Sequence, residues 1–102
     1  MRDVAEPGER QVGAVFAALA DPTRRRVVRV LAERRTVTAS ALADELPITR
    51  QAIAKHLAAL AKAGLVTAEH EGRETRYRLT ETGAEWDDRL DALARHLRRR
   101  RP

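Results

Sequence analysis

The chain has 102 residues, a net charge of +5 at pH 7 and no cysteine. A chain of this length forms one domain with a limited core, so oligomerisation is a reasonable source of added stability. The lack of cysteine excludes disulfides, thiolate chemistry and zinc-finger sites. No apolar run approaches the roughly 18 residues that span a bilayer, and the N-terminus lacks a hydrophobic signal segment, so we expect a cytoplasmic protein.

The positive charge is unevenly distributed along the chain. Residues 98–101 supply four of the five net positive charges. Basic residues also outnumber acidic ones over residues 23–35 and 47–79, whereas residues 80–97 carry five acids against two arginines. A basic half and an acidic C-terminal helix favour DNA on one side and a dimer partner or solvent on the other.

Two helices are predicted before residue 35. The first covers residues 9–19, after a polar segment, residues 1–8, that we expect to be mobile; its apolar side chains share one side, namely Val12, Val15, Phe16 and Leu19. Asp21 and Pro22 open the second, because aspartate caps free N–H groups and proline loses no hydrogen bond at the first helical position. Its apolar residues face the core, and four arginines form either a solvated face or contacts to DNA phosphates: Arg24, Arg25, Arg26 and Arg29.

A short helix is predicted over residues 39–46, with Thr38 or Ser40 as its cap. Pro47 ends it, because the proline ring disfavours a helical conformation of the residue before it. Just ahead of this helix, Val37 can pair briefly with the hairpin described below as a third strand. The chain must turn at Pro47 before the next helix.

Thr49 is the predicted N-cap of a longer helix that Gly64 ends. At about 100° per residue, Ile53, Leu57 and Leu60 share one face of this helix. The opposite face is polar or small, and it carries Gln51, Lys55, Ala58 and Lys62. A core stripe is thus separated from a face that can read DNA.

The major groove of B-DNA admits an α-helix, and glutamine and lysine can supply hydrogen bonds specific for adenine and guanine. We therefore predict base contacts from Gln51 and Lys55. Thr49 and Arg50 lie at the positive N-terminal end of the helix, where we expect them to contact a base or a phosphate.

Residues 65–79 predict a β-hairpin, because apolar and charged residues alternate on the two sides of Gly72. Gly72 supplies the positive φ that a tight turn needs. The arginines of the hairpin are placed to touch phosphates or a narrow minor groove: Arg73, Arg76 and Arg78. We expect His70 to be simply exposed to solvent, without a functional role. Residues 38–79 together predict a winged helix-turn-helix, whose ligand is duplex DNA.

The last predicted helix begins at Thr80 as its cap and runs through the arginine-rich tail. Apolar residues recur in it at spacings of four, three and four, namely Trp86, Leu90, Leu93 and Leu97. This narrow seam is typical of coiled-coil packing, which requires a partner helix. The alternative is a seam that packs only on its own domain.

Three linked segments over residues 15–79 resemble the ArsR/SmtB family of bacterial transcriptional regulators: ALADPTRRRVVRVLA, ALADELPITRQAIAKHLAALAKAGLV and EGRETRYRL. The resemblance implies a homodimeric repressor whose first and last helices form the dimer interface and whose fourth helix enters the major groove. Residues 49–56 would then recognise DNA. His56 lies in this segment, and its alternative role is a structural hydrogen bond. Ala54 departs from the family, which commonly has a serine there, so an alanine methyl group replaces a hydroxyl.

The residues of the family's common metal sites are missing. Residues 39–46 contain no cysteine, which removes the thiolate site. On the last helix, Asp88, Asp91 and His96 lack the paired-histidine spacing that zinc favours. The chain instead resembles members without an evident metal site, some of which end in a W-x-x-R-L-x-x-L pattern, here at Trp86, Arg89, Leu90 and Leu93. We therefore predict no metal and no cofactor, with His96 and its acidic neighbours as the open alternative.

The predicted fold is mainly α with a small β-hairpin, a winged helix-turn-helix of about five helices and a two-stranded wing. We assign residues 1–102 to a single domain, with dimerisation helices at 8–19 and 80–100, the helix-turn-helix at 38–64 and the wing at 65–79. The predicted dimer interface consists of Val12, Phe16, Trp86, Leu90, Leu93 and Leu97.

The predicted function is sequence-specific DNA binding, as a dimeric repressor of an inverted-repeat operator. The alternatives are a winged-helix protein-interaction module and a regulator that relies on an effector or a partner protein for sensing. An enzyme is not expected, because the sequence has no nucleophile elbow, phosphate-binding glycine loop or clustered acid–base set.

Overall fold

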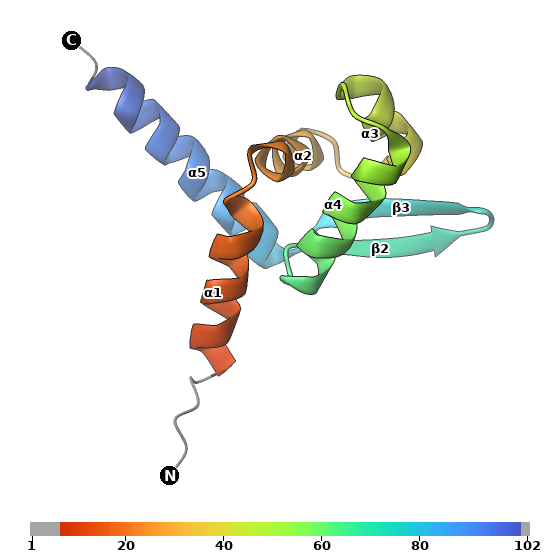
Figure 1. Ribbon diagram of the computed structural model, residues 1–102, viewed down its shortest axis with the longest axis horizontal. Helices are drawn as coiled ribbons and strands as arrows, with labels where there is room; N and C mark the ends of the chain where they lie inside the picture. Colours follow the sequence, from red (N-terminus) through yellow and green to blue (C-terminus); the bar gives the residue numbers. More distant parts are fainter. Residues whose placement is uncertain (1–6, 101–102) are drawn as a thin grey trace.

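The computed structural model describes residues 7–100, which form five helices and one three-stranded antiparallel sheet (Figure 1). In chain order the elements are α1 (Pro7–Leu19), α2 (Pro22–Glu33), β1 (Val37–Thr38), α3 (Ala39–Glu45), α4 (Arg50–Lys62), β2 (Val66–Glu71), β3 (Glu74–Leu79) and α5 (Glu81–Arg99). The winged helix-turn-helix prediction is confirmed. Of the segment predicted to be mobile, residues 1–6 lie outside the described part of the chain, and residues 7 and 8 belong to α1.

The sheet has the strand order β1-β3-β2. β2 and β3 form the predicted hairpin, and Gly72 has the expected positive φ of 62° at its turn. Val37 pairs with Tyr77, which confirms the short third strand. The sheet therefore has three strands, one more than the two-stranded wing of the predicted fold.

Side-chain caps begin the helices where the sequence predicts them. The Asp21 carboxylate accepts hydrogen bonds from the backbone N–H groups of Thr23 and Arg24, at 2.7 and 3.0 Å. The Thr38 hydroxyl accepts the N–H of Ala41 at the start of α3, so Thr38 is the cap and Ser40 lies inside the helix, exposed. α4 and α5 begin in the same way, with the hydroxyls of Thr49 and Thr80.

The core is aliphatic and centres on α2, α3 and α4. Its largest fully buried side chains are Leu42, Ile53, Leu57, Leu60, Leu65, Val15, Val27 and Val28. Leu42 of α3 meets the buried stripe of α4 in this cluster, which holds the two helices of the helix-turn-helix together. Because the stripe of α4 is buried here, the opposite face of that helix points to solvent.

α5 is fastened to the turn between α4 and β2. The N–H of Thr80 donates to the Leu65 carbonyl at 3.0 Å, and the Thr80 hydroxyl donates to the Gly64 carbonyl at 2.6 Å. Gly64 follows the C-cap residue, Ala63, and has a φ of 83°. Gly83 packs so closely that an added Cβ would lie 2.1 Å from the Leu65 carbonyl oxygen. α5 therefore packs closely against the turn that follows α4.

Figure 1 shows α1 and α5 diverging on one side of the molecule, while the β2–β3 hairpin projects on the other side, beyond α4. Within residues 7–100, no helix is both long enough and apolar enough to cross a membrane.

Candidate nucleic-acid interface

The buried and the exposed residues of α4 lie on opposite faces of the helix, as predicted. Ile53, Leu57 and Leu60 are at most 1% exposed. The opposite face is open to solvent along its whole length, at Gln51, Lys55, Ala58 and Lys62. Thr49, at the N-terminal end of α4, is also exposed, although its hydroxyl already accepts the N–H of Ala52 at 3.1 Å. The long polar side chains of this face are free to reach a ligand.

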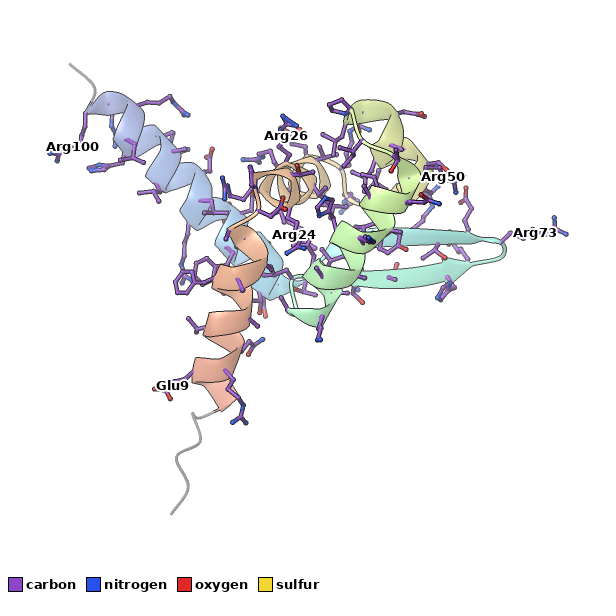
Figure 2. All side chains as sticks on the ribbon, in the orientation of Figure 1. Glu9, Arg24, Arg26, Arg50, Arg73 and Arg100 are labelled. Carbon is purple, nitrogen blue, oxygen red and sulfur yellow. The ribbon has the colours of Figure 1, made fainter. Side chains whose placement is uncertain are left out.

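A groove of about 380 Å³ lies between the N-terminal ends of α3 and α4 and the hairpin. Arg50 and Arg73 both line it, the first from the start of α4 and the second from the hairpin tip (Figure 2). Neither arginine forms an ion pair with a carboxylate among residues 7–100. The Ser40 hydroxyl lines the same groove, although the sequence suggested only a cap there. The structure thus brings two guanidinium groups without an ion pair to one groove at the N-terminal end of α4.

The other two arginines of the hairpin lie elsewhere. Arg76 and Arg78 flank Tyr77 in β3, and successive side chains of a strand point to opposite faces. Tyr77 lines the groove, so Arg76 and Arg78 lie on the reverse face of the hairpin. Arg76 pairs with Glu74 at 3.3 Å, and Arg78 pairs with Glu69 at 3.0 Å. The structure does not bring these two arginines together with α4.

His56 is half-buried between α2 and α4. Its Nδ1 accepts a hydrogen bond from Nε of Arg24 at 3.2 Å. The predicted structural hydrogen bond of His56 is therefore present. The nearby Asp21 carboxylate caps α2, and the backbone N–H groups of Arg24 and Thr23 hold its pKa below the usual range, with His56 and Arg24 adding a smaller effect.

Most of the arginine cluster of α2 is used within the fold, which neither sequence interpretation anticipated. Arg24 donates to His56, and Arg25 donates to the Leu19 carbonyl at 2.6 Å. Arg29 pairs with Asp87 at 3.3 Å. Arg26 points outward from α2 (Figure 2) and makes no hydrogen bond or ion pair with residues 7–100.

Asp87 is a structural residue that the sequence analysis missed. It lies on the inner face of α5, one turn after Gly83, and its side chain is only 8% exposed. Burial raises the pKa of its carboxyl group, and the Arg29 guanidinium opposes part of that rise. The spacing from Gly83 was the available signal, since residues four apart share a helix face.

Within residues 7–100 there is no group of three or more histidine or acidic side chains close enough to hold a metal ion. Asp91, one of the acids considered for such a site, is bound to Arg95 at 2.7 Å and to Arg29 at 3.6 Å.

A second surface, here called the apolar face, lies on α1 and α5. Its residues are those predicted for the dimer interface: Val12, Phe16, Trp86, Leu90, Leu93 and Leu97. Phe16, Leu93 and Leu97 are more than half exposed, while Trp86 and Leu90 are half-buried. The rings of Phe16 and Trp86 meet edge to face, with centroids 5.3 Å apart. The outer leucines of the seam therefore have little cover within the protomer.

The same fold occurs in solved structures of bacterial regulators. An ArsR-like transcriptional regulator from Rhodococcus sp. RHA1 is 41% identical, with a TM-score of 0.69 over 88% of this chain and 95% of that chain. The homodimeric winged helix-turn-helix DNA-binding domain of a possible ArsR-family regulator from Mycobacterium bovis is 26% identical, with a TM-score of 0.83 over 100% of this chain and 98% of that one.

Sequence comparisons agree with the structural ones. The regulator YuzN of Bacillus subtilis, an uncharacterized HTH-type transcriptional regulator, is 47% identical over 66 residues, which are 59% of this chain and 72% of YuzN. The HTH-type transcriptional regulator CmtR of Mycobacterium tuberculosis is 38% identical over 76% of this chain, but the match spans only 64% of CmtR. Residues 19–69 match the family described as "Helix-turn-helix domain". The chain therefore belongs to the ArsR/SmtB family of winged helix-turn-helix transcriptional regulators, which are DNA-binding proteins and not enzymes.

Proposed function

We propose that the chain acts as a dimeric repressor that reads an inverted-repeat operator through α4 and the hairpin. One observation carries the proposal. The exposed face of α4 lies beside a groove whose two arginines have no acidic partner among the described residues. Guanidinium groups at the start of a reading helix and at the tip of the neighbouring hairpin suit the phosphate backbone that borders a major groove.

Base contacts are assigned to Gln51 and Lys55. Both are exposed on the side of α4 opposite the core, near its N-terminal end. Glutamine pairs with the N6 and N7 atoms of adenine, and lysine donates to guanine. Ala54, also exposed, offers a methyl group to a thymine methyl.

Phosphate contacts are assigned first to Arg50 and Arg73, with Thr49 beside them at the start of α4. Arg76 and Arg78 are weaker candidates, because each is already paired with a glutamate of the hairpin. His56 contributes by holding Arg24 against α4, with a direct phosphate contact as a secondary role.

The dimer is assigned to the apolar face, through helices 8–19 and 80–100. Side chains such as Leu97, 56% exposed, are unfavourable in water and gain free energy when a second copy covers them. The similar M. bovis domain is homodimeric. A two-fold axis would place the two α4 helices in major grooves about one helical turn apart, which is what an inverted repeat requires.

A gel-shift titration against the DNA upstream of the gene, at two salt concentrations, tests the proposal. We expect tight binding that weakens steeply with salt and a clear preference over random duplex. Gln51→Ala and Lys55→Ala should each cost about 1–3 kcal/mol and relax the sequence preference. Glu85→Ala, an exposed change on α5, is the control and should bind like the parent.

Two results would contradict this assignment. Salt-independent binding, or no preference over random duplex, would favour the protein-interaction module instead. If Gln51→Ala binds the operator as tightly and as selectively as the parent, the proposed orientation of α4 on DNA is wrong.

A further inference from the structure

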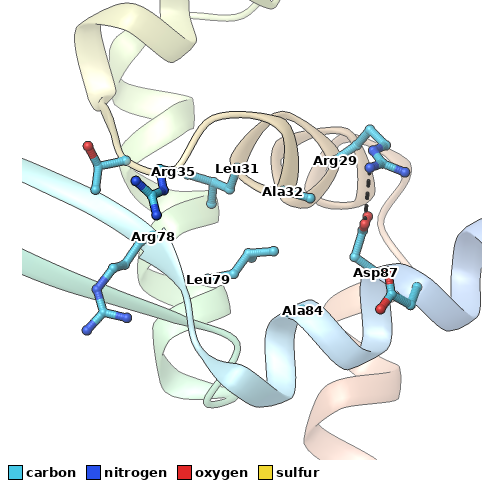
Figure 3. A pocket seen from close by; sticks show the side chains of 10 residues that line it. Arg29, Leu31, Ala32, Arg35, Arg78, Leu79, Ala84 and Asp87 are labelled. Carbon is cyan, nitrogen blue, oxygen red and sulfur yellow. Dashed lines mark ion pairs between the residues drawn. The ribbon is translucent and has the colours of Figure 1, made fainter.

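A cavity of about 700 Å³ lies between α2, β3 and the start of α5, apart from both the DNA-reading groove and the apolar face (Figure 3). Small-molecule sites commonly measure roughly 300–1,000 Å³. Of its lining residues, only Arg78 has been given a role above, as a weaker candidate for DNA contact. Besides α2, its walls are β3, a strand of the wing, and α5, a helix of the apolar face.

The middle of the cavity is apolar. Leu31 and Ala32 of α2 line one side, and Leu79 of β3 and Ala84 of α5 line the other. Figure 3 shows the two leucines side by side between the charged ends of the cavity. A ligand that lies here gains by burying a short apolar body against Ala32, Leu79 and Ala84, whereas Leu31 is already buried in the core.

One end of the cavity is cationic. Arg35 and Arg78 both line it, and Figure 3 shows both residues at that end, with the side chain of Arg78 extending away from Arg35. Arg35 makes no ion pair or hydrogen bond with residues 7–100, and the only acidic partner of Arg78 there is the half-exposed Glu69. Planar guanidinium groups match the geometry of a carboxylate.

The opposite end is closed by the ion pair of Arg29 with Asp87, 3.3 Å apart, with Asp88 exposed beside it. Asp88 leaves that end with an acidic rim. A second negative group on a ligand would be repelled there. The cavity is therefore suited to one anionic group, held at the end of Arg35 and Arg78.

We propose that this cavity binds a small organic monoanion, a carboxylate attached to a short apolar body, as an effector of the regulator. Binding neutralises positive charge beside the wing and draws Arg78 from Glu69, in a cavity whose far wall is α5. Occupancy therefore lowers the affinity for DNA. This second step rests on the proposed function, whereas binding of the anion does not.

The binding step is tested by NMR titration of the ¹⁵N-labelled protein with hexanoate, with the neutral hexanamide as the matched ligand. We expect saturable shifts at the amides of Arg35, Leu79 and Ala84 with hexanoate only. Arg35→Ala should weaken hexanoate binding about fivefold or more, because it removes a charged hydrogen-bond donor. Arg26→Ala removes an arginine of α2 outside the cavity and should leave binding unchanged.

Ala84→Leu, which fills the apolar floor, provides a second variant that does not depend on the arginines. It should abolish the saturable shifts. The proposal is overturned if hexanoate causes no saturable shift, if hexanamide causes the same shifts, or if Arg35→Ala and Ala84→Leu both bind hexanoate like the parent.

The coupling step is tested by operator binding with and without saturating hexanoate, at constant ionic strength. We expect affinity to fall about fivefold or more in the parent and to stay constant in Arg35→Ala. Operator binding that saturating hexanoate leaves unchanged refutes the coupling. A protein that binds hexanoate but no operator refutes the proposed function and leaves the anion site intact.

Discussion

The α4 and hairpin region and the apolar face both expose side chains without partners in the protomer, but the exposed groups are chemically opposite. Beside α4 they are arginines, which water solvates well and which can bind a negatively charged group. On α1 and α5 they are Phe16, Leu93 and Leu97, which are unfavourably exposed to water. The arginine surface is therefore favourable in water without a ligand, whereas the apolar face gains free energy only when another surface covers it, which in the proposed dimer is a second copy.

The two regions are in contact where α5 begins, beside the turn after α4, and also where α1 packs on α4. Thr80 bonds to the turn after α4, and Gly83 allows α5 to approach that turn at backbone distance. Because α5 packs closely against this turn, the position of α5 in the proposed dimer would determine where α4 lies. The distance between the two reading helices of the dimer therefore depends on this contact.

The largest expected effect is on the apolar face. Leu93→Asp places a charge where the second copy should bury a leucine, twice in a symmetric dimer, and should weaken dimerisation by about 4 kcal/mol or more. Sedimentation should find a folded monomer, since Leu93 is 53% exposed in the protomer. Ala92→Asp, one residue away and exposed, is the control and should remain dimeric. A dimeric Leu93→Asp would move the interface elsewhere.

The second-largest effect is expected at the contact between α5 and the turn that follows α4. Gly83→Ala forces a Cβ against the Leu65 carbonyl, so we expect a loss of about 2–3 kcal/mol in the free energy of unfolding. Denaturant unfolding measures this loss. Glu85→Ala in the same turn of α5 is exposed and should change stability by less than about 0.5 kcal/mol. Equal stabilities of the two variants would mean that α5 is not packed against the turn as described.

Within the hairpin, Arg73 and Arg78 provide a matched comparison on DNA. Arg73→Ala should weaken binding to all sequences alike by about 1 kcal/mol and reduce the salt slope by about 1, as for one phosphate contact. Arg78→Ala should have a smaller effect, because Arg78 is paired with Glu69 on the reverse face. Salt titrations of operator binding separate the two. A larger loss for Arg78→Ala would mean that the reverse face of the hairpin, and not the face of Arg73, contacts DNA.

The smallest expected effect concerns Asp87. Because its pKa is raised by burial, the folded protein keeps a proton that the unfolded chain has lost, so this group lowers stability as the pH rises through its folded pKa. Asp87→Asn removes that dependence and should stabilise the protein by less than about 1 kcal/mol at pH 7. The gain should vanish in acid, below the pKa of an unfolded aspartate. Thermal unfolding across this pH range checks both the sign and the window, and a variant less stable at pH 7 would contradict the prediction.

Much of the fold could be predicted because its signals are local. Asp21, Thr49 and Thr80 cap helices through their own neighbours, and the 3.6-residue period of α4 separates a buried stripe from an exposed face. The pairing of Val37 with β3 could also be predicted, as one more strand beside an alternating hairpin.

The candidate site was predicted less completely. Arginines of α2 looked alike in the sequence, yet Arg24 bonds to His56, Arg25 bonds to carbonyl groups and Arg29 pairs with the buried Asp87. These partners lie on other elements or at a turn, so the spacing of residues within α2 does not reveal them. The same is true of the groove that Arg50 and Arg73 share across two elements.

By itself, the sequence determined the helices, their caps, the hairpin and the two faces of α4, because each depends on residues within a few positions of one another. The tertiary structure decided which arginines stay free, where α5 meets the α4–β2 turn, and how α2, β3 and α5 enclose a cavity with one cationic end. Those features depend on side chains that are distant in the chain and adjacent only after folding. Their charges and hydrogen bonds are satisfied or left free by that packing.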